Sequence, residues 1–389
     1  MDYMKKTIPQ LKDICREKGV KGYSGKSKAK IIELLTSQKT EAPDTLRTEP
    51  RYRVLSLFSG MCGMDVGFAE QVVVHRDSVN PEFIESPHQI EGFVNLKRLP
   101  FDTVFQNDIL PEAKRIAELN NWNHNYQLKD IRTLLHENYA FPSADVITGG
   151  FPCQDFSHAG KRQGFDAARG TLYQSYVELV RRIKPTMFVA ENVNGLLTMP
   201  GAIETIVADF TAVGYNVKYQ LMKCEEFGIP QTRHRVIIMG LRVDKKIVGP
   251  WNVITENRRT CYLRSYFSGL AEPDVTTDPA QQVYSKAARL AKGQGQKEVN
   301  LDGFSPTMRA EHHGNIEFRR VTGGPEAGLQ RRLTVREAAL IQTFPPDCVL
   351  TEARPTSKAY KPIGNAVPPL LGYLIARKVR EILSKVDSP

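Results

Sequence analysis

The segment from Ala144 to Ser157 constrains the fold of this chain more than any other. Its short apolar run, Val146-Ile147, is followed by Gly149-Gly150, a pattern typical of a buried strand that ends abruptly. Pro152 then stiffens the turn that carries Cys153. In an open α/β sheet, the crevice that binds ligands lies beyond the carboxyl ends of the strands. The segment therefore predicts an α/β sheet with a thiol at that edge, although a lone cysteine is more often an inert buried group.

The chain has 389 residues, of which 41% are hydrophobic and 25% charged, enough for a globular catalytic domain with one or two smaller modules. No apolar run approaches the roughly 18 residues that span a bilayer, and the first residues lack the apolar core of a secretion signal. We therefore expect a cytoplasmic protein with no membrane partner, associated with the nucleoid if the source is prokaryotic. The six cysteines form no C-x-x-C pair, so the sequence predicts neither a disulfide framework nor a metal site.

The net charge of +10 favours a polyanionic partner. The first 40 residues hold ten lysines and arginines against four acids, so +6 of that charge lies there. Amphipathic patterns at residues 9–15 and 27–35 predict two short helices. The unit formed by residues 1–36 resembles a SAP-type helix-extended-helix DNA-binding motif, whose lysines would contact phosphates. A helical hairpin without a ligand is the alternative. Residues 37–50 have little to bury and are expected to form a linker.

A second glycine-rich turn follows the strand predicted at residues 52–58. Ser59-Gly-Met-Cys-Gly63 then leads into a helix, and such a turn can bring backbone close to a nucleotide-type ligand, although a plain strand-to-helix turn fits the pattern equally. An acid at the end of the next strand, Asp108, can accept ribose hydroxyls, and the neighbouring Ile109 can cover an adenine face. The pair Asp130-Ile131 follows. Either acid alone is more often a solvated loop residue.

Two stretches differ from the rest of the chain. Residues 71–102 contain Asn-Pro, Ser-Pro and Leu-Pro pairs, and we expect a surface loop of unknown role inserted before the strand that ends at Asp108. From about residue 244 to 331, strong periodicity disappears, and proline, glycine and basic residues recur together with side chains suited to base edges. His312-His313 within this stretch lack further ligands, so no metal is expected there.

Further charged groups follow predicted strands. The buried strand Met187–Ala190 places Glu191 on the same sheet edge as Cys153, unless Glu191 merely caps the next helix. Alternate residues of a strand share a face, so three polar side chains further on are expected to point one way. These are Gln231, Arg233 and Arg235.

Taken in order, these motifs resemble those of DNA (cytosine-5) methyltransferases over roughly residues 52–383. Gly-Gly-Phe-Pro-Cys-Gln is similar to the nucleophile loop of that family, Glu-Asn-Val to its carboxylate motif, and Gln-x-Arg-x-Arg to the motif that grips the base. The segments beginning at Arg332 and Lys361 are similar to the ninth and tenth motifs, with a helix expected at residues 370–383. One departure lies in the turn Ser59-Gly-Met-Cys-Gly63, which is similar to the first motif of the family. Cys62 stands there at a position where the family usually has glycine.

The resemblance implies a fold and a reaction. It implies a Rossmann-like S-adenosylmethionine-dependent methyltransferase domain (51–243), a target-recognition region (244–331) and C-terminal motifs that return to the catalytic domain (332–389). The methyl group would pass from S-adenosylmethionine to C5 of a flipped cytosine through a covalent bond between Cys153 and C6. The resemblance assigns catalysis to Cys153, Glu191, Arg233 and Arg235. It assigns cofactor binding to Phe58, Gly60, Gly63, Asp108, Ile109, Asp130, Ile131, Pro152, Leu172 and Asn365.

Double-stranded DNA is the expected substrate, and the chain is expected to act as a monomer. At the family level, the chain is expected to be the modification enzyme of a restriction-modification system, with a cognate restriction endonuclease as a functional and not necessarily physical partner. An RNA (tRNA) cytosine-5 methyltransferase of the same architecture is one alternative, and the large region after Arg235 and the basic N-terminus argue against it. A catalytically silent DNA-binding protein is another, and the intact Cys153, Glu191 and Arg235 argue against that.

Overall fold

The chain folds into two compact units, Met1–Pro50 and Arg51–Pro389. In the first unit, helix α1 (Ile8–Glu17) buries Leu11 and Cys15, as its amphipathic pattern predicted. Of the second predicted helix only residues 27, 28 and 31 are described, and the SAP-like segment between the two helices lies outside the described residues. The computed structural model describes residues 6–17, 26–28, 31, 51–152, 172–247, 250–254, 256–286, 297–310, 318–320, 330–350 and 357–386.

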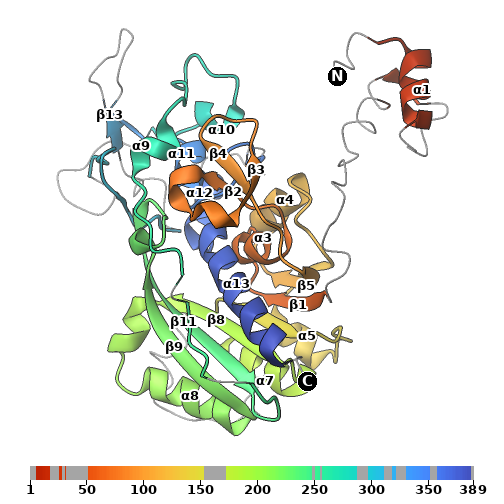
Figure 1. The fold of residues 1–389 in the computed structure, drawn as a ribbon, viewed down its shortest axis with the longest axis vertical. Helices are drawn as coiled ribbons and strands as arrows, with labels where there is room; N and C mark the ends of the chain where they lie inside the picture. The colour runs from red at the N-terminus through yellow and green to blue at the C-terminus, as the bar shows by residue number, and fades with distance from the viewer. Residues whose placement is uncertain are drawn as a thin grey trace. The chain divides into compact units, whose positions relative to one another are not determined.

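The second unit is built on a seven-stranded sheet with the strand order β6-β5-β1-β7-β8-β11-β9 (Figure 1). Strand β11 runs antiparallel to both β8 and β9, and the other neighbouring strands are parallel. The predicted α/β fold with a Rossmann-like sheet is therefore confirmed. The strands are β1 (Tyr52–Leu57), β5 (Phe101–Asp108), β6 (Tyr126–Leu128), β7 (Val146–Gly149), β8 (Met187–Val193), β9 (Tyr215–Lys223) and β11 (His234–Arg242).

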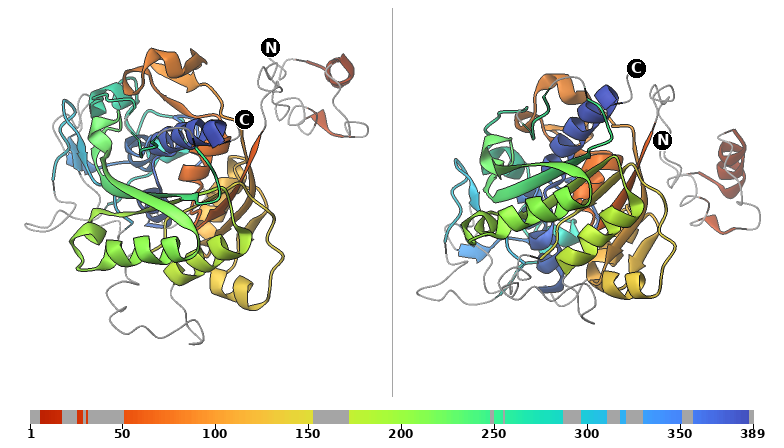
Figure 2. Two further views of the ribbon diagram at one scale, coloured as in Figure 1. Left: turned by 60° about the horizontal axis from the view of Figure 1, so that its bottom comes forward. Right: turned by 90° about the horizontal axis from the view of Figure 1, so that it is seen from below.

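Both faces of this sheet are covered, which explains why its central strands are apolar at successive positions. In β7, Val146 belongs to one hydrophobic cluster and Ile147 to the other, because successive side chains of a strand point to opposite faces. Helices α7 and α8 lie on one face and α13 on the other (Figure 2). The helices packed on the sheet are α3 (Gly63–Ala69), α4 (Pro111–Leu119), α5 (Ile131–His136), α7 (Leu172–Ile183), α8 (Ala202–Ala212) and α13 (Pro369–Val386).

Residues 71–102 are not the surface loop that the proline pairs suggested. They form a three-stranded antiparallel sheet, β2-β4-β3, and bury Phe83 and Phe93 in the same hydrophobic cluster as the catalytic sheet. The strands are too short to show a clear period, and the core that they join is assembled from distant parts of the chain. The elements are β2 (Val73–His75), η2 (Arg76–Ser78), η3 (Pro81–Phe83), β3 (Ile84–Pro87) and β4 (Phe93–Leu96).

The remaining elements are short and follow the catalytic strands or precede α13. Thr334 caps α11 and forms the predicted capping box with Glu337. Within the described part of the chain, no helix is both long and apolar enough to cross a membrane. These elements are η4 (Asn194–Thr198), η5 (Cys224–Glu226), β10 (Gln231–Thr232), α9 (Leu263–Phe267), α10 (Pro279–Gln282), β12 (Ser305–Pro306), β13 (Phe318–Arg320), β14 (Gln330–Arg332), α11 (Val335–Ile341) and α12 (Ser357–Asn365).

The last helix, α13, packs against α3, the helix that follows the first glycine turn. Helices α3 and α13 cross where glycine faces glycine: a β-carbon on Gly67 would stand 2.4 Å from the backbone of Gly372. Such an approach is open only to residues without a side chain. The two ends of the second unit therefore meet beside the sheet edge where its parallel strands end (Figure 1).

Candidate active site

A cavity of about 480 Å³ opens where β7 and β8 end. Its walls come from five segments that are distant in sequence: the residues after β7, the end of β8, the neighbouring start of β11, residues 307–310 and residues 364–365. A volume of this size is in the range of small-ligand sites. Among the residues that the sequence assigned to a site, it gathers Pro152, Glu191, Arg233, Arg235 and Asn365.

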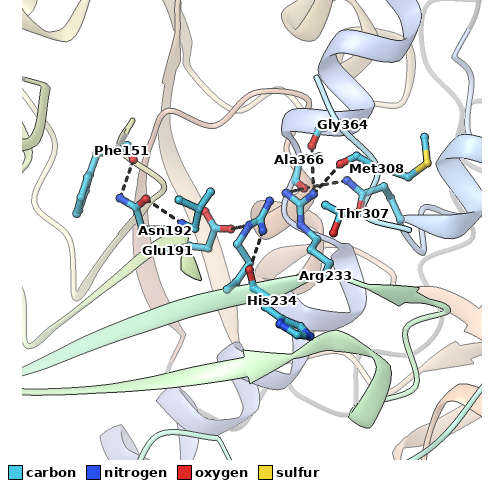
Figure 3. A network of polar contacts seen from close by, with 12 residues as sticks. Phe151, Glu191, Asn192, Arg233, His234, Thr307, Met308, Gly364 and Ala366 are labelled. Atoms are coloured by element: carbon cyan, nitrogen blue, oxygen red, sulfur yellow. Dashed lines mark hydrogen bonds and ion pairs between the residues drawn. The ribbon is translucent and has the colours of Figure 1, made fainter. Parts of the chain in front are cut away.

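Glu191 and Arg235 form an ion pair inside this cavity. The Nε atom of Arg235 lies 2.7 Å from Oε1 of Glu191, and each side chain is only 12% exposed. The guanidinium also donates to the carbonyl of His234 at 2.7 Å, which fixes its orientation (Figure 3). On the other side, a β-carbon at Gly150 would stand 2.9 Å from Oε2 of Glu191, so the glycine makes room for the carboxylate. The pair is thus held between β8, β11 and the turn after β7.

The turn that leads to Cys153 is anchored, while Cys153 itself lies outside the described residues. Asn192 donates its side-chain amide to the carbonyl of Phe151 at 3.0 Å, and its own oxygen accepts from the backbone N–H of Val193 (Figure 3). Pro152 is exposed and lines the cavity. Asn192 was not among the predicted site residues, although it lies inside the Glu-Asn-Val motif.

Arg233 occupies a different position from the one its strand pattern suggested. Gln231, Arg233 and Arg235 were expected to point one way along a strand, but the strand is broken between β10 and β11, and both Gln231 and Arg233 are buried. The guanidinium of Arg233 donates to three backbone carbonyls (Figure 3). Burial, and then the nearby charge of Arg235, lower the pKa of Arg233 to about 9. The accepting carbonyls are those of Met308, Gly364 and Ala366.

Arg233 therefore ties together two segments that the sequence could not connect. Met308 belongs to the expected recognition region, and Gly364 and Ala366 flank Asn365. Gln231 strengthens the same junction, because its side-chain oxygen accepts from the backbone N–H of Met308 at 3.2 Å. Gly364 also lies so close to Arg309 that a β-carbon there would stand 2.0 Å from its backbone.

A second group of predicted residues meets at the ends of β1 and β5. The backbone N–H of Gly60 donates to Asp108 at 2.8 Å, and the carboxylate also accepts from the backbone N–H groups of Ile109 and Leu110. Burial raises the pKa of Asp108 above its usual range. A β-carbon on Gly60 would meet nothing within 4 Å, and Ile109 is 60% exposed. These three groups fit S-adenosylmethionine: Gly60 leaves room for the ligand to approach the backbone, the Asp108 carboxylate can accept from the ribose hydroxyls, and the exposed Ile109 can cover the adenine.

The remaining predicted cofactor residues are arranged differently. Asp130 caps α5 by accepting from the backbone N–H of Arg132, whose guanidinium also pairs with it and lowers the pKa of the carboxyl group. Ile131 is 1% exposed and packs in the hydrophobic cluster, so we place it in the core rather than on a ligand surface. Leu172 and Phe58 are partly buried against the same cluster.

Cys62, which stands where glycine is usual, adopts a left-handed backbone conformation. Its φ of 66° lies in the left-handed region that glycine would occupy. Its buried sulfur accepts from the side-chain amide of Gln106 at 3.2 Å, and the same amide donates to Asp65 and to the carbonyl of Trp122. These buried hydrogen bonds thus stabilise the turn from its core side.

The order and directions of the strands are those of Rossmann-like methyltransferases, with the cofactor residues and the ion pair at the edge where ligands bind. The family model "C-5 cytosine-specific DNA methylase" matches residues 52–381, and the chain belongs to this family. It is therefore an enzyme that uses S-adenosylmethionine as its methyl donor.

Relatives resemble the chain over most of its length. The Type II methyltransferase M.BspRI of Lysinibacillus sphaericus is 32% identical over 382 residues, covering 90% of this chain and 88% of the relative. M.BsuRI of Bacillus subtilis is 31% identical over 357 residues, covering 85% of this chain and 79% of the relative.

Solved structures share the fold at lower sequence identity. The Entamoeba histolytica methyltransferase EhMeth has a TM-score of 0.59 at 17% identity and covers 86% of this chain and 99% of its own. The S. pombe Dnmt2 methyltransferase has a TM-score of 0.58 at 20% identity and covers 85% and 99%.

Proposed function

We propose that this enzyme methylates C5 of a cytosine within a specific DNA sequence, with the base flipped into the 480 Å³ cavity and bonded through C6 to Cys153. The observation that carries the proposal is the ion pair of Glu191 and Arg235, held at the cavity wall beside the turn that leads to Cys153. The restriction-modification relatives support a role as the modification enzyme of such a system, with a cognate endonuclease as functional partner.

Cytosine C5 is a poor nucleophile, so the chain must first activate the ring. The thiolate of Cys153 adds to C6, forming the S–C6 bond and making C5 electron-rich. Glu191 holds the proton shared with ring N3 and so offsets the charge that develops on the ring. S-adenosylmethionine supplies an electrophilic methyl group when bound. Once C5 carries the methyl group, the C5 proton passes to solvent, and the electrons of that C–H bond restore the C5=C6 double bond as the S–C6 bond breaks. This step releases methylated cytosine and the thiolate.

Arg235 orients the carboxylate for this role. Its Nε contact with Glu191 and its donation to the His234 carbonyl leave the guanidinium little freedom. A rigid acceptor loses less energy to reorganisation during the reaction than a mobile one. Asn192 does not contact the base itself. Its hydrogen bond to the Phe151 carbonyl fixes the turn before Cys153. Arg233 is only 2% exposed and its guanidinium donates to three backbone carbonyls, so we assign it to positioning rather than to the base.

The cavity favours a flipped base. Its walls enclose Glu191 between strands and a recognition segment, and a base still stacked in a duplex cannot reach such a carboxylate. Unstacking costs a few kcal/mol, which contacts inside the pocket must offset. Residues 244–331, which include Thr307 to Ala310 on the cavity wall, are the proposed recognition region.

The basic unit of residues 1–36 is proposed to hold DNA by its phosphates without reading sequence. We further propose that residues 37–50 link it to the catalytic domain (51–243), that residues 332–389 return to that domain, and that the enzyme acts as a monomer. A monomer fits a reaction on one strand at a time. Analytical ultracentrifugation with and without duplex DNA tests this, and a stable dimer would reject it.

The experiment that tests the function is bisulfite sequencing of a plasmid from a methylation-free host that expresses the full chain. Protected cytosines in one repeated short context are the expected result. Duplex DNA carrying 5-fluorocytosine in that context should then trap a covalent complex with the wild type, since fluorine blocks the final elimination, but not with Cys153→Ala. An unmethylated plasmid together with methylated tRNA would reject DNA as the substrate.

A further inference from the structure

The inserted sheet of residues 71–102 meets two other parts of the chain at one buried junction. Asn257, from the expected recognition region, is 2% exposed and lies at its centre. Its side-chain oxygen accepts from the backbone N–H of Asn80 at 2.8 Å. Its amide donates to the carbonyls of Ser78 at 3.0 Å and Phe227 at 3.1 Å. The Asn257 side chain thus hydrogen-bonds to backbone groups of both the insertion and the segment that follows β9.

The three parts approach more closely than ordinary side chains would allow. Gly228 has a φ of 83°, and a β-carbon there would stand 2.0 Å from the carbonyl oxygen of Ser78. Asn257 itself has a φ of 62°, a left-handed conformation in which asparagine is among the few tolerated residues. Both positions are shaped for this contact, because neither a bulkier nor a β-branched residue fits them.

Helix α9 adds further contacts to the junction through two of its side chains. The hydroxyl of Tyr266 lies 2.8 Å from the buried hydroxyl of Ser78, and its ring packs edge-on against Phe93 of β4. Ser265 donates to Asp77 at 3.0 Å. Figure 1 shows β2, β3 and β4 in the same part of the molecule as α9 and α10, apart from the lower strands of the catalytic sheet.

The junction is connected along the chain to the two arginines of the cavity. Gly228 is followed by the buried Ile229 and then by Gln231 and Arg233, which hold Met308 in place, and next by Arg235. A shift at Gly228 therefore reaches both the ion pair with Glu191 and the wall formed by residues 307–310. On the far side, the hydroxyl of Tyr373 donates to the carbonyl of Lys97, which fixes the insertion to α13.

We propose that residues 71–102 are a brace that fixes the target-recognition region to the strand carrying Arg233 and Arg235, and that Asn257 is its central positioning residue. The proposal rests on the function proposed above. Asn257 touches no substrate; it acts through residues 228–235. Loosening the junction lets the recognition region dock on wrong sequences while the cofactor cradle, at the ends of β1 and β5, is unchanged.

The test compares four full-length proteins: wild type, Asn257→Gly, Tyr266→Phe and the control Asn95→Gly. Asn257→Gly removes the side chain but tolerates the positive φ, and Tyr266→Phe removes one oxygen. Asn95 of β4 is a matched control, because its amide donates to Ser86 and Pro87 entirely within the insertion. The measurements are single-turnover methylation of the wild-type target and of duplexes with one base pair changed, affinity for S-adenosylmethionine, and melting temperature.

We expect Asn257→Gly to lower the ratio of target to altered-duplex rates by about ten-fold, since small misplacements of reacting groups have effects of this order or larger. Tyr266→Phe should shift the ratio in the same direction, and cofactor affinity should stay at the wild-type value. If Asn257→Gly and Asn95→Gly lose similar thermal stability while both keep the wild-type ratio, the insertion only stabilises the fold and the proposal is wrong. If Asn257→Gly does not fold, the rate ratio of Tyr266→Phe tests the proposal: a lowered ratio supports it, and the wild-type ratio contradicts it. A wild type that methylates no DNA would instead reject the proposed function.

Discussion

Gly63, the first residue of α3, lies directly against the backbone of Val367 near the other end of the catalytic unit. A β-carbon on Gly63 would stand 2.0 Å from the carbonyl oxygen of Val367 and 3.3 Å from the ring of Phe344. Asn365, two residues before Val367, lines the cavity that contains Glu191. This contact therefore connects the first glycine turn to the wall of that cavity, and it depends on the absence of a side chain at Gly63.

The two glycines of the first turn should respond differently to alanine. Gly63→Ala forces a methyl group into the Val367 backbone, and we expect a loss of about 1–3 kcal/mol or more in the free energy of unfolding. Gly60→Ala meets nothing within 4 Å, so only its φ of 53° adds strain, of about 1 kcal/mol, while the new methyl group obstructs the open face toward the cofactor. Urea unfolding and cofactor titration separate these effects. Equal stability losses would contradict the close contact at Gly63.

Glu191→Gln should slow methyl transfer by about 100-fold or more, because glutamine keeps the shape but cannot hold the proton shared with ring N3. DNA affinity should change little. Arg235→Lys keeps the charge but not the fixed fork that orients the carboxylate, so an intermediate loss is expected. Single-turnover transfer of a labelled methyl group measures both variants. A Glu191→Gln enzyme with the wild-type rate would exclude Glu191 from proton handling.

Arg233→Met should act mainly on stability. The substitution leaves the buried carbonyls of Met308, Gly364 and Ala366 without this donor, and each such loss costs about 1–3 kcal/mol. We expect a lower urea midpoint, together with faster hydrogen exchange in residues 305–310 and 363–367. A variant with wild-type stability but no activity would show that Arg233 contacts the substrate after all.

Stability should depend on pH through Asp65. Burial raises the pKa of this carboxyl from 3.8 to about 6. The folded state therefore binds more protons than the unfolded state between these values, so the stabilising contribution of the protonated group is lost as pH rises through about 6. Asp65→Asn removes this dependence, and its stability relative to wild type should increase by up to about 3 kcal/mol between pH 4 and pH 8. Asp274→Asn serves as the control for the loss of an exposed carboxyl group.

Deletion of residues 1–40 should weaken DNA binding and flatten its salt dependence, because the lysines and arginines in this stretch would no longer release counterions. The methylated sequence should stay the same. The catalytic unit begins at Arg51 as a separate compact body, so the truncated chain is expected to fold. Bisulfite sequencing and binding titrations at two salt concentrations measure the two quantities. A changed target sequence would show that the N-terminal unit reads bases.

The sequence by itself determined the local features of this protein. Short apolar runs predicted β1, β7 and β8, and the Thr334–Glu337 pattern predicted the start of α11, because propensity and capping depend on neighbouring residues. The motif order predicted the family and its cofactor. Glu191 and Arg235 were both selected as site residues, but their spacing in the chain gives no distance between them.

Only the tertiary structure decided which of these groups meet and which are buried. Strand order brings β11 beside β8 and so pairs Arg235 with Glu191, while the break before β11 directs Arg233 into the core. The insertion became part of the core because its short apolar runs pack against α9 and α13, which lie far away in the sequence. Burial is a property of the assembled chain, so no local pattern could distinguish a solvated loop from the sheet that holds Asn257 in place.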